Sequence, residues 1–328
     1  MVTDIKYADL APEHPLFTET VVPHLLEWRR AGIPSALVTL VGVEGSSPRR
    51  PGSQLTVNVH GDYVGHISSG CAEAAIVAEA VNVIKDGVAR AVRYGNGSKY
   101  VDVVLPCGSG LDLVFDPVIT TTTLECVASA VAERRTVALA IDPAARVSAA
   151  IIHQDAQADL NSDQLFIRRY VPAVRVVIAG RSVHVDFMAR LAKDLEWDVQ
   201  IVSPDKAVLA RLSPVAQGSQ HLTRPEDFDA SVLDAHSAMV LLFHDHDWEP
   251  QLLARCAQTP AFYVGAMGSR RTHAQRILLL QELGLDQAFI ARVHGPAGLS
   301  LDARNPAEIA LAITAQILTL TPRPGLRS

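Results

Sequence analysis

Cysteine is scarce in this sequence: four cysteines are scattered over 328 residues, at Cys71, Cys107, Cys126 and Cys256. No two of them form a C-x-x-C pair, which excludes a zinc knuckle or a redox dithiol as the organising feature. The sequence also has no uninterrupted apolar run of membrane-spanning length, and its acidic N-terminus lacks the apolar stretch of a signal peptide. We therefore expect a cytoplasmic protein, without a membrane span, whose thiols stay reduced.

An excess of basic residues is missing as well. Lys and Arg together number 29, Asp and Glu number 35, and the formal net charge is -6. General binding to nucleic acid requires a basic field over a whole face, so we expect no nucleic-acid partner. Hydrophobic residues make up 48% and charged residues 20%, which is typical of a globular protein. An anionic ligand would therefore have to be bound by a local cluster of cations.

The first half of the chain predicts a mixture of helices and strands. A helix is expected over residues 22–30, followed by an apolar strand over residues 35–43. A hairpin is expected over residues 54–67, and an alanine-rich helix over about residues 71–85, which Gly87 would end.

A different pattern follows the polar stretch 154–164, which is the best candidate for a linker. Continuous apolar strands, such as 174–179 and 238–243, alternate with helices, and this pattern predicts a parallel sheet covered on both faces. We therefore predict an α/β protein. An N-terminal α+β domain covers residues 1–155, and a Rossmann-like parallel-sheet domain covers residues 172–328 and ends in a C-terminal helix.

Three unusual turns fall at the carboxyl ends of predicted parallel strands, where ligands of such sheets bind: residues 180–184, 244–246 and 265–271. In the last turn, glycines let the backbone approach a ligand, and Ser269 can cap the following helix. Free N–H groups at that helix start, with two arginines beside them, favour a phosphate or a carboxylate. The alternative interpretation is a solvated turn between a strand and a helix.

The other two turns are less diagnostic. Residues 180–184 occupy the place of the dinucleotide fingerprint but do not spell G-x-G-x-x-G, since Ser182 stands where a glycine would admit a pyrophosphate. Tight NAD binding is therefore not expected. His244 and His246 suit metal binding or proton transfer, but the same segment could instead cap the next helix through an aspartate such as Asp247.

The first half has two comparable segments, the arginine-bearing loop 46–52 and the segment around Cys71. A cysteine in the first turn of a helix should have a lowered pKa, because the helix dipole favours the thiolate. Thiolates coordinate soft metals and attack sulfur, so Cys71 is a candidate metal ligand or sulfur acceptor. Cys107 also lies in a glycine-rich loop. The alternative for both is a small buried apolar residue, the commonest state of a free cysteine.

Taken in order, these segments resemble the xanthine dehydrogenase accessory protein family, XdhC/CoxI. In the first half the matching pieces are Glu44-Gly-Ser-Ser-Pro-Arg-Arg-Pro-Gly52, Ser69-Gly-Cys-Ala-Glu73 and Leu105-Pro-Cys-Gly108. In the second half they are His244-Asp-His246, Tyr263-Val-Gly-Ala-Met-Gly-Ser-Arg-Arg271 and His294-Gly-Pro-Ala-Gly-Leu299. The similarity spans nearly the whole chain.

The resemblance implies a chaperone that binds molybdenum cofactor (molybdopterin) transiently and without a turnover of its own. It implies sulfuration of the cofactor with a cysteine desulfurase, and insertion into a molybdenum hydroxylase apoenzyme of the xanthine dehydrogenase type. Cofactor contacts, with Cys71 also as the metal contact, are predicted at Ser47, Arg49, Arg50, Cys71, Glu73, Cys107, His244, His246, Gly268, Ser269, Arg270 and Arg271.

Other functions stay open at the level of sequence. The main rival is an NAD(P)-dependent oxidoreductase built on the Rossmann-like domain, although no acid or base for hydride transfer stands out. A fused nucleotidyltransferase would need a further nucleotide loop, and a purely structural subunit would leave the clustered turns unexplained. A homodimer is also expected, because dimers are common among α/β proteins of this kind.

Overall fold

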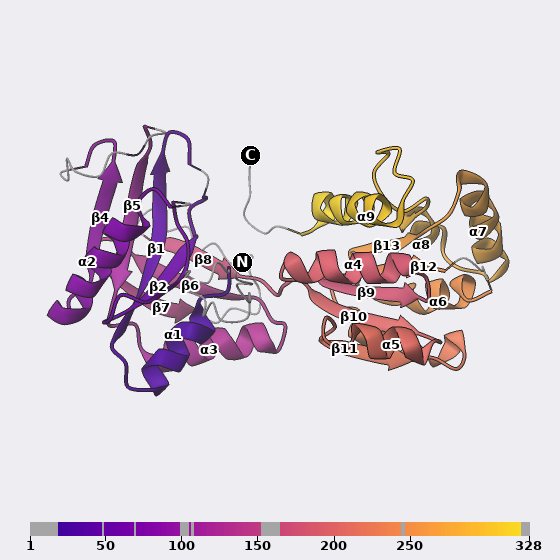
Figure 1. The fold of residues 1–328 in the computed structure, drawn as a ribbon, viewed down its shortest axis with the longest axis horizontal. Helices are drawn as coiled ribbons and strands as arrows, with labels where there is room; N and C mark the ends of the chain where they lie inside the picture. The colour runs from indigo at the N-terminus through magenta and orange to yellow at the C-terminus, as the bar shows by residue number, and fades with distance from the viewer. Residues whose placement is uncertain are drawn as a thin grey trace, which may run out of the picture. The chain divides into compact units, whose positions relative to one another are not determined.

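The computed structural model of the chain describes residues 19–47, 49–68, 70–98, 105, 108–151, 165–243 and 247–322 (Figure 1). The chain divides into two compact units, Met1–Pro172 and Ala173–Ser328. In the part that the structure describes, no helix combines the length and the apolar character needed to cross a membrane. Among the residues that the structure describes, no sheet contains strands of both units.

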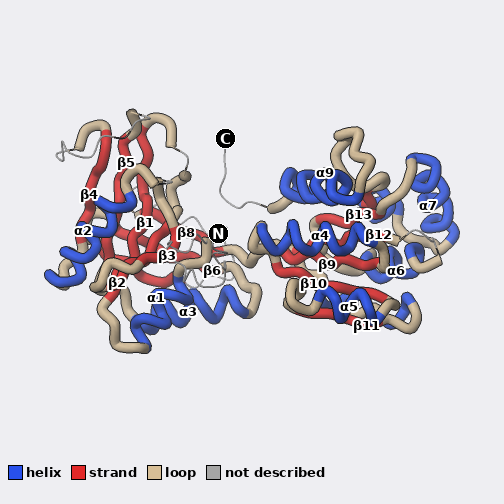
Figure 2. The backbone as a smooth tube through the Cα atoms, viewed as in Figure 1, coloured by secondary structure: helices blue, strands red, loops and turns tan. Residues whose placement is uncertain are grey.

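The N-terminal unit contains a five-stranded antiparallel sheet in the order β3-β2-β1-β5-β4 (Figure 2). Its strands are β1 (Ser35–Glu44), β2 (Gln54–Asn58), β3 (Tyr63–Gly65), β4 (Arg90–Gly95) and β5 (Gly110–Asp116). The hairpin that the sequence predicts over residues 54–67 is confirmed as β2 and β3. Helix α2 (Glu73–Asp86) buries its apolar side chains against one face of this sheet.

The opposite face of the sheet packs on a second layer. This layer contains helices α1 (Val22–Arg30) and α3 (Thr121–Ala132) and a smaller antiparallel sheet in the order β7-β6-β8. The strands of the smaller sheet are β6 (Val137–Asp142), β7 (Val147–Ile151) and β8 (Phe166–Tyr170). Strand β8 was not predicted from the sequence.

One end of the five-stranded sheet gathers the loops that carry the candidate residues of this unit. Because neighbouring strands run antiparallel, the ends of β1, β3 and β4 lie at the same edge as the starts of β2 and β5. The loop from β1 to β2, the segment from β3 to α2 and the connection from β4 to β5 therefore all leave the sheet at that end. These three connections contain Arg49, Cys71 and Cys107, respectively.

The C-terminal unit is a six-stranded parallel sheet in the order β11-β10-β9-β12-β13-β14. The strands are β9 (Arg175–Gly180), β10 (Asp198–Ser203), β11 (Gly218–His221), β12 (Ser237–Leu242), β13 (Tyr263–Ala266) and β14 (Val293–His294). The predicted fold class, an α+β part followed by a Rossmann-like parallel sheet, is confirmed. The near-continuous burial of β9 and β12 explains why both strands are apolar after their first residue.

Helices cover both faces of the parallel sheet (Figure 1). On one face lie α4 (Val183–Asp194), α5 (Lys206–Leu212) and α9 (Pro306–Leu320). On the other lie α6 (Glu249–Cys256), α7 (Arg270–Glu282) and α8 (Gln287–Arg292). The two faces have separate hydrophobic clusters, so the sheet is the shared central layer of this unit.

Two helix starts differ from what the sequence predicts. Helix α2 begins at Glu73, with Ala72 at its N-cap, so Cys71 precedes the first turn and does not lie in it. Helix α6 has Trp248 at its N-cap without a side-chain cap, so Asp247 does not cap it. By contrast, Gly87 ends α2 in the left-handed conformation, as predicted.

Candidate functional site

The carboxyl edge of the parallel sheet brings two of the predicted turns together. Ser182, in the turn after β9, donates a hydrogen bond from its Oγ to the carbonyl oxygen of Leu242 at 3.1 Å. The amide of Met267, after β13, donates to the carbonyl oxygen of Leu241 at 2.9 Å. Both acceptors belong to the end of β12, so these turns lie on one edge of the sheet, as the sequence predicts.

Residues 267–271, called the anion turn from here on, lead from β13 into α7. Gly268 has a φ of +143°, and a Cβ atom there would lie 3.2 Å from the Cβ of Thr272, so the position requires glycine. Ser269 caps α7 as predicted, because its Oγ accepts a hydrogen bond from the amide of Thr272 at 3.1 Å. The other amides of a first helical turn have no carbonyl partner within the helix.

Two exposed arginines flank these amides. The side chains of Arg270 and Arg271 form no hydrogen bond or ion pair with any other residue that the structure describes. Their guanidinium groups therefore add two uncommitted cations to the positive end of the α7 dipole. Cations combined with helix-start amides suit a phosphate or a carboxylate, so the chemistry predicted for this turn fits its geometry.

A buried ion pair underlies the anion turn. Arg276 of α7 donates from Nε and Nη2 to Oε2 of Glu249 of α6, at 3.0 and 2.8 Å. Its Nη2 also donates to the carbonyl oxygen of Met267 at 2.9 Å. Sequence reasoning missed both residues. One available signal was that Arg276 precedes the buried Leu280 by four residues and so shares its inward helix face.

Two histidines lie beside the same turn. The ring of His294 stacks on that of Tyr263, with centroids 4.8 Å apart and planes 6° apart. Burial lowers the pKa of His294. The pKa of His273 is also lowered, by burial first and then by the positive charges of Arg276 and His294. The arginines at this turn keep their positive charge at any pH near neutrality.

The two arginines of the loop between β1 and β2 differ in their interactions. Arg49 forms an ion pair with Glu19 at 2.6 Å, and its amide donates to Oγ of Ser47 at 3.3 Å. Arg50 is exposed, and no hydrogen bond of its side chain to another described residue is present. Of the three predicted contacts in this loop, Arg50 is thus the side chain most available to a ligand.

The segment around Cys71 is organised by Glu73, the first residue of α2. Oε1 of Glu73 accepts hydrogen bonds from the amides of Ile67 and Ser68, at 3.0 and 2.7 Å. Oε2 accepts from Oγ of Ser68 and from the amide of Gly70, the latter at 2.6 Å. Cys71 is exposed as a free thiol at the surface of this segment. The helix-start position predicted for the cysteine is therefore taken by a carboxylate.

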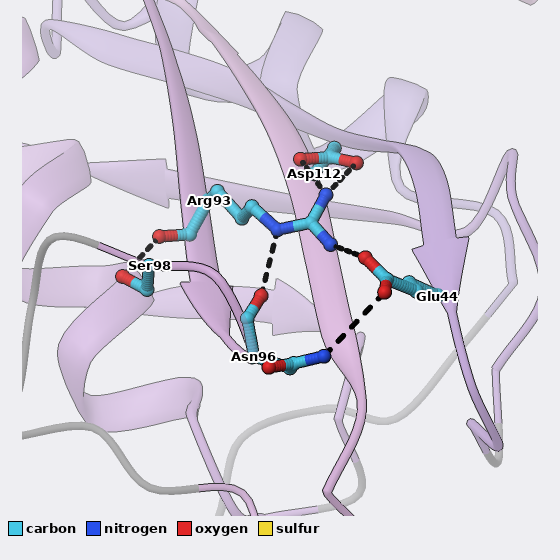
Figure 3. A network of polar contacts seen from close by, with 5 residues as sticks. All are labelled: Glu44, Arg93, Asn96, Ser98 and Asp112. Carbon is cyan, nitrogen blue, oxygen red and sulfur yellow. Dashed lines mark hydrogen bonds and ion pairs between the residues drawn. The ribbon is translucent and has the colours of Figure 1, made fainter.

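Figure 3 shows how the same sheet end is tied together. Arg93 of β4 contacts both Glu44, the last residue of β1, and Asp112 of β5, the latter at 3.0 Å. Its Nε also donates to the carbonyl oxygen of Asn96 at 2.7 Å. The network joins three strands where the loops leave the sheet, and it thereby fixes the points from which the candidate loops begin.

Three predicted contacts, Cys107, His244 and His246, lie outside the described residues. Within the part of the chain that the structure describes, no group of three or more His, Cys, Asp or Glu residues is placed to hold a metal ion. A contact between Cys71 and a metal stays a prediction.

Comparisons with known proteins now decide the family. Residues 176–317 match the XdhC Rossmann domain, and residues 28–95 match the XdhC and CoxI family. The molybdenum cofactor insertion chaperone PaoD of Escherichia coli (strain K12) is 31% identical over 313 residues, which cover 94% of this chain and 91% of PaoD. This chain belongs to the XdhC/CoxI family. The resemblance seen in the sequence motifs is confirmed.

Two further proteins extend the comparison of this XdhC/CoxI member. The uncharacterised protein YqeB of Escherichia coli (strain K12) is 23% identical over 290 residues, 87% of this chain and 43% of YqeB. A crystal structure described as a xanthine dehydrogenase from Bacillus halodurans has a TM-score of 0.75 and 22% identity. It covers 92% of this chain and 96% of its own, and the likeness shows a shared fold.

The two family matches contain most of the predicted contacts. The match over residues 28–95 includes the arginine loop, Cys71 and Glu73, and the match over residues 176–317 includes the anion turn. Cys107 lies in the interval between the two matches. Apart from Cys107, the predicted contacts of both units therefore lie in segments that match the family.

Proposed function

We propose that this XdhC/CoxI member binds molybdenum cofactor, supports its sulfuration with a cysteine desulfurase, and inserts it into a molybdenum hydroxylase of the xanthine dehydrogenase type. In this proposal the cofactor is cargo and the apoenzyme is the receiving partner. The similarity to the molybdenum cofactor insertion chaperone PaoD carries the proposal, because it extends over 94% of this chain.

Each unit has groups whose chemistry suits a part of the cargo, and each is considered by itself. Molybdopterin ends in a phosphate, and this terminal phosphate suits the anion turn, where Arg270 and Arg271 adjoin the start of α7. The molybdenum or its sulfur suits a thiol, and Cys71 is exposed as a free one. Arg50 supplies a further uncommitted cation in the N-terminal unit. We propose these residues as cargo contacts, with Glu73 holding the segment that presents Cys71.

Retention of molybdenum cofactor by the purified chain tests the proposal. We expect about one cofactor per chain after gel filtration, and weaker retention in Arg270→Ala and in Cys71→Ala. A hydrogen bond to a charged group contributes about 1.5–3 kcal/mol, so Arg270→Ala should weaken binding about tenfold or more. Arg304→Ala and Cys126→Ala are matched controls, because Arg304 is an exposed arginine paired with Asp302 and Cys126 lies in α3.

The same preparation should restore activity to a molybdenum hydroxylase apoenzyme, and more fully when a cysteine desulfurase and a sulfur source are present. If the apoenzyme regains the same activity with and without the cysteine desulfurase, the proposed role in sulfuration is wrong. The proposed role in cofactor insertion is then unaffected. Tight binding of NADPH together with no retention of the pterin would contradict the proposal and favour an oxidoreductase.

A further inference from the structure

The ion pair between Arg276 and Glu249 is the most deeply buried one among the described residues of the C-terminal unit. Each side chain is 2% exposed, and the pair links α7 to α6 through two hydrogen bonds to one carboxylate oxygen. Removing two charges from water is costly, and apolar replacements of buried pairs are often neutral or stabilising. Stability alone therefore does not account for an arginine and a glutamate at these positions.

The surroundings of Arg276 point to the anion turn. Its Nη2 donates to the carbonyl oxygen of Met267, and its Nη1 lies 3.4 Å from Nδ1 of His273. A Cβ atom on Gly268 would lie 3.5 Å from the same Nη2. The buried guanidinium of Arg276 thus packs against the first residues of the anion turn. Arg270 and Arg271 are exposed to solvent at the end of the same turn.

The contact with Met267 fixes the direction of the backbone. The amide of Met267 donates to the carbonyl oxygen of Leu241, and its carbonyl oxygen accepts from Arg276, so both sides of this residue are tied to the interior. A carbonyl oxygen that faced the ligand would repel an anion. A carbonyl held inward leaves the amide groups and arginines at the helix start to meet the ligand.

We propose that Arg276, held by Glu249, is a positioning residue that preorganises the anion turn for the phosphate of the cargo. The proposal rests on the function proposed above and deepens it, because it assigns phosphate selectivity to a buried pair that does not touch the ligand. When the amides and arginines of the anion turn are already oriented, binding of an anion does not carry the entropic cost of ordering them. The Arg276–Glu249 pair therefore affects the affinity for the phosphate more than the stability of the fold.

The decisive variant replaces both charges at once, Glu249→Leu with Arg276→Met, because an apolar pair of similar volume avoids leaving one buried charge unpaired. Arg276→Lys keeps the charge but cannot donate in the same forked geometry. The matched control is Asp186→Leu with Arg211→Met. That pair also has two hydrogen bonds from an arginine to a carboxylate, at 2.6 and 2.9 Å, but joins α4 to α5.

Each full-length protein is tested for its thermal midpoint and for binding of two probes, molybdenum cofactor and the same pterin after removal of its terminal phosphate. We expect the wild type to prefer the phosphorylated probe about tenfold or more, as a charged hydrogen bond would give. The double variant should stay folded and lose this preference, Arg276→Lys should lose part of it, and the control pair should keep it.

A folded double variant that retains the full preference overturns the positioning role. If the double variant does not fold, Arg276→Lys is the test. A folded Arg276→Lys protein that prefers the phosphorylated pterin as strongly as the wild type does overturns the proposal. A wild type that binds neither probe contradicts the proposed function itself. A wild type that binds both probes equally leaves the proposed function standing and overturns only the assignment of phosphate to the anion turn.

Discussion

Helix α7 carries arginines whose surroundings differ sharply. Arg270 and Arg271 are exposed at its start, whereas Arg276, further along the same helix, is buried and paired with Glu249. An exposed guanidinium can move to meet a ligand, but a buried one with its donors engaged holds other groups in place. The partners of each arginine, rather than its residue type, therefore separate ligand contact from positioning.

Glu73 shows the same distinction for a carboxylate. Burial would raise the pKa of Glu73, but hydrogen bonds from Ser68 and from the amides of Ile67 and Gly70 outweigh it and hold the pKa below 4.5. The native state therefore binds this proton less readily than the unfolded chain. The stability contributed by the carboxylate is complete above about pH 4.5 and is lost as the pH falls through the lowered native value.

We predict that Glu73→Gln destabilises the N-terminal unit and weakens the acid dependence of its stability. An amide cannot accept from all four donors, and a buried donor left unsatisfied costs about 1–3 kcal/mol. Urea unfolding at pH 7 and at pH 4 measures both effects. Glu133→Gln is the control, because that carboxylate is hydrogen-bonded at the surface. An unchanged acid dependence in Glu73→Gln would show that the four hydrogen bonds do not set the pKa.

At the scale of elements, the start of α7 can be compared with the start of α3. Ser269 caps α7 by accepting from the amide of Thr272, and Thr120 caps α3 by accepting from that of Thr123, both at 3.1 Å. Removing either hydroxyl should cost about 1 kcal/mol of stability. The two caps are equivalent for folding, but only one adjoins the anion turn.

We therefore predict that Ser269→Ala and Thr120→Ala destabilise by similar amounts and differ in cofactor retention. Ser269→Ala should bind molybdenum cofactor more weakly, because the first turn of α7 frays where the phosphate would be held. Thr120→Ala should bind it as the wild type does. Denaturant unfolding and cofactor titration on the same samples measure the two quantities, and equal binding by both variants would argue that the start of α7 is not a cargo contact.

The helices and strands that can be predicted from the sequence are those whose apolar residues follow directly from burial in the fold. Strands β9 and β12 are apolar after their first residue because both faces of the parallel sheet are covered, and these continuous apolar runs, alternating with helices, identify them. Strand β8 escapes prediction because it contains Arg168 and Arg169 and is only half-buried. It pairs with β6, and Tyr170 donates to Oε1 of Gln54, contacts that link distant parts of the chain and leave no local pattern.

The candidate site divides in the same way. The anion turn is visible in the sequence because glycine, serine and two arginines are consecutive and their chemistry is local. The ion pair between Arg276 and Glu249 cannot be seen in the sequence. Its two residues are 27 positions apart and meet only when α6 and α7 pack on the same face of the sheet. The sequence predicts Cys71 in the first turn of a helix, and the helix begins two residues later, a shift within the usual uncertainty of helix ends.

At the scale of the whole molecule, the two units are built independently. The described helices and strands of each unit form their own hydrophobic clusters, and no sheet is shared. The net charge of -6 provides no general attraction for an anion. Cargo binding must therefore come from local groups, which in the proposed function are a thiol in one unit and arginines in the other.

This division predicts the behaviour of the C-terminal unit alone, produced as residues 173–328. Its parallel sheet and both covering helix layers are complete within that segment, so it should unfold in one cooperative transition within about 5 °C of its midpoint in the full chain. Calorimetry of the segment and of the full chain compares the two midpoints. A segment that does not fold would show that the N-terminal unit stabilises it.

The same segment separates the two proposed contacts with the cargo. It keeps the anion turn and lacks Cys71, so it should retain the preference for the phosphorylated pterin that we expect of the full chain. Titration of the segment with the two pterin probes measures this preference. A folded segment without the preference would contradict the assignment of the phosphate to the anion turn.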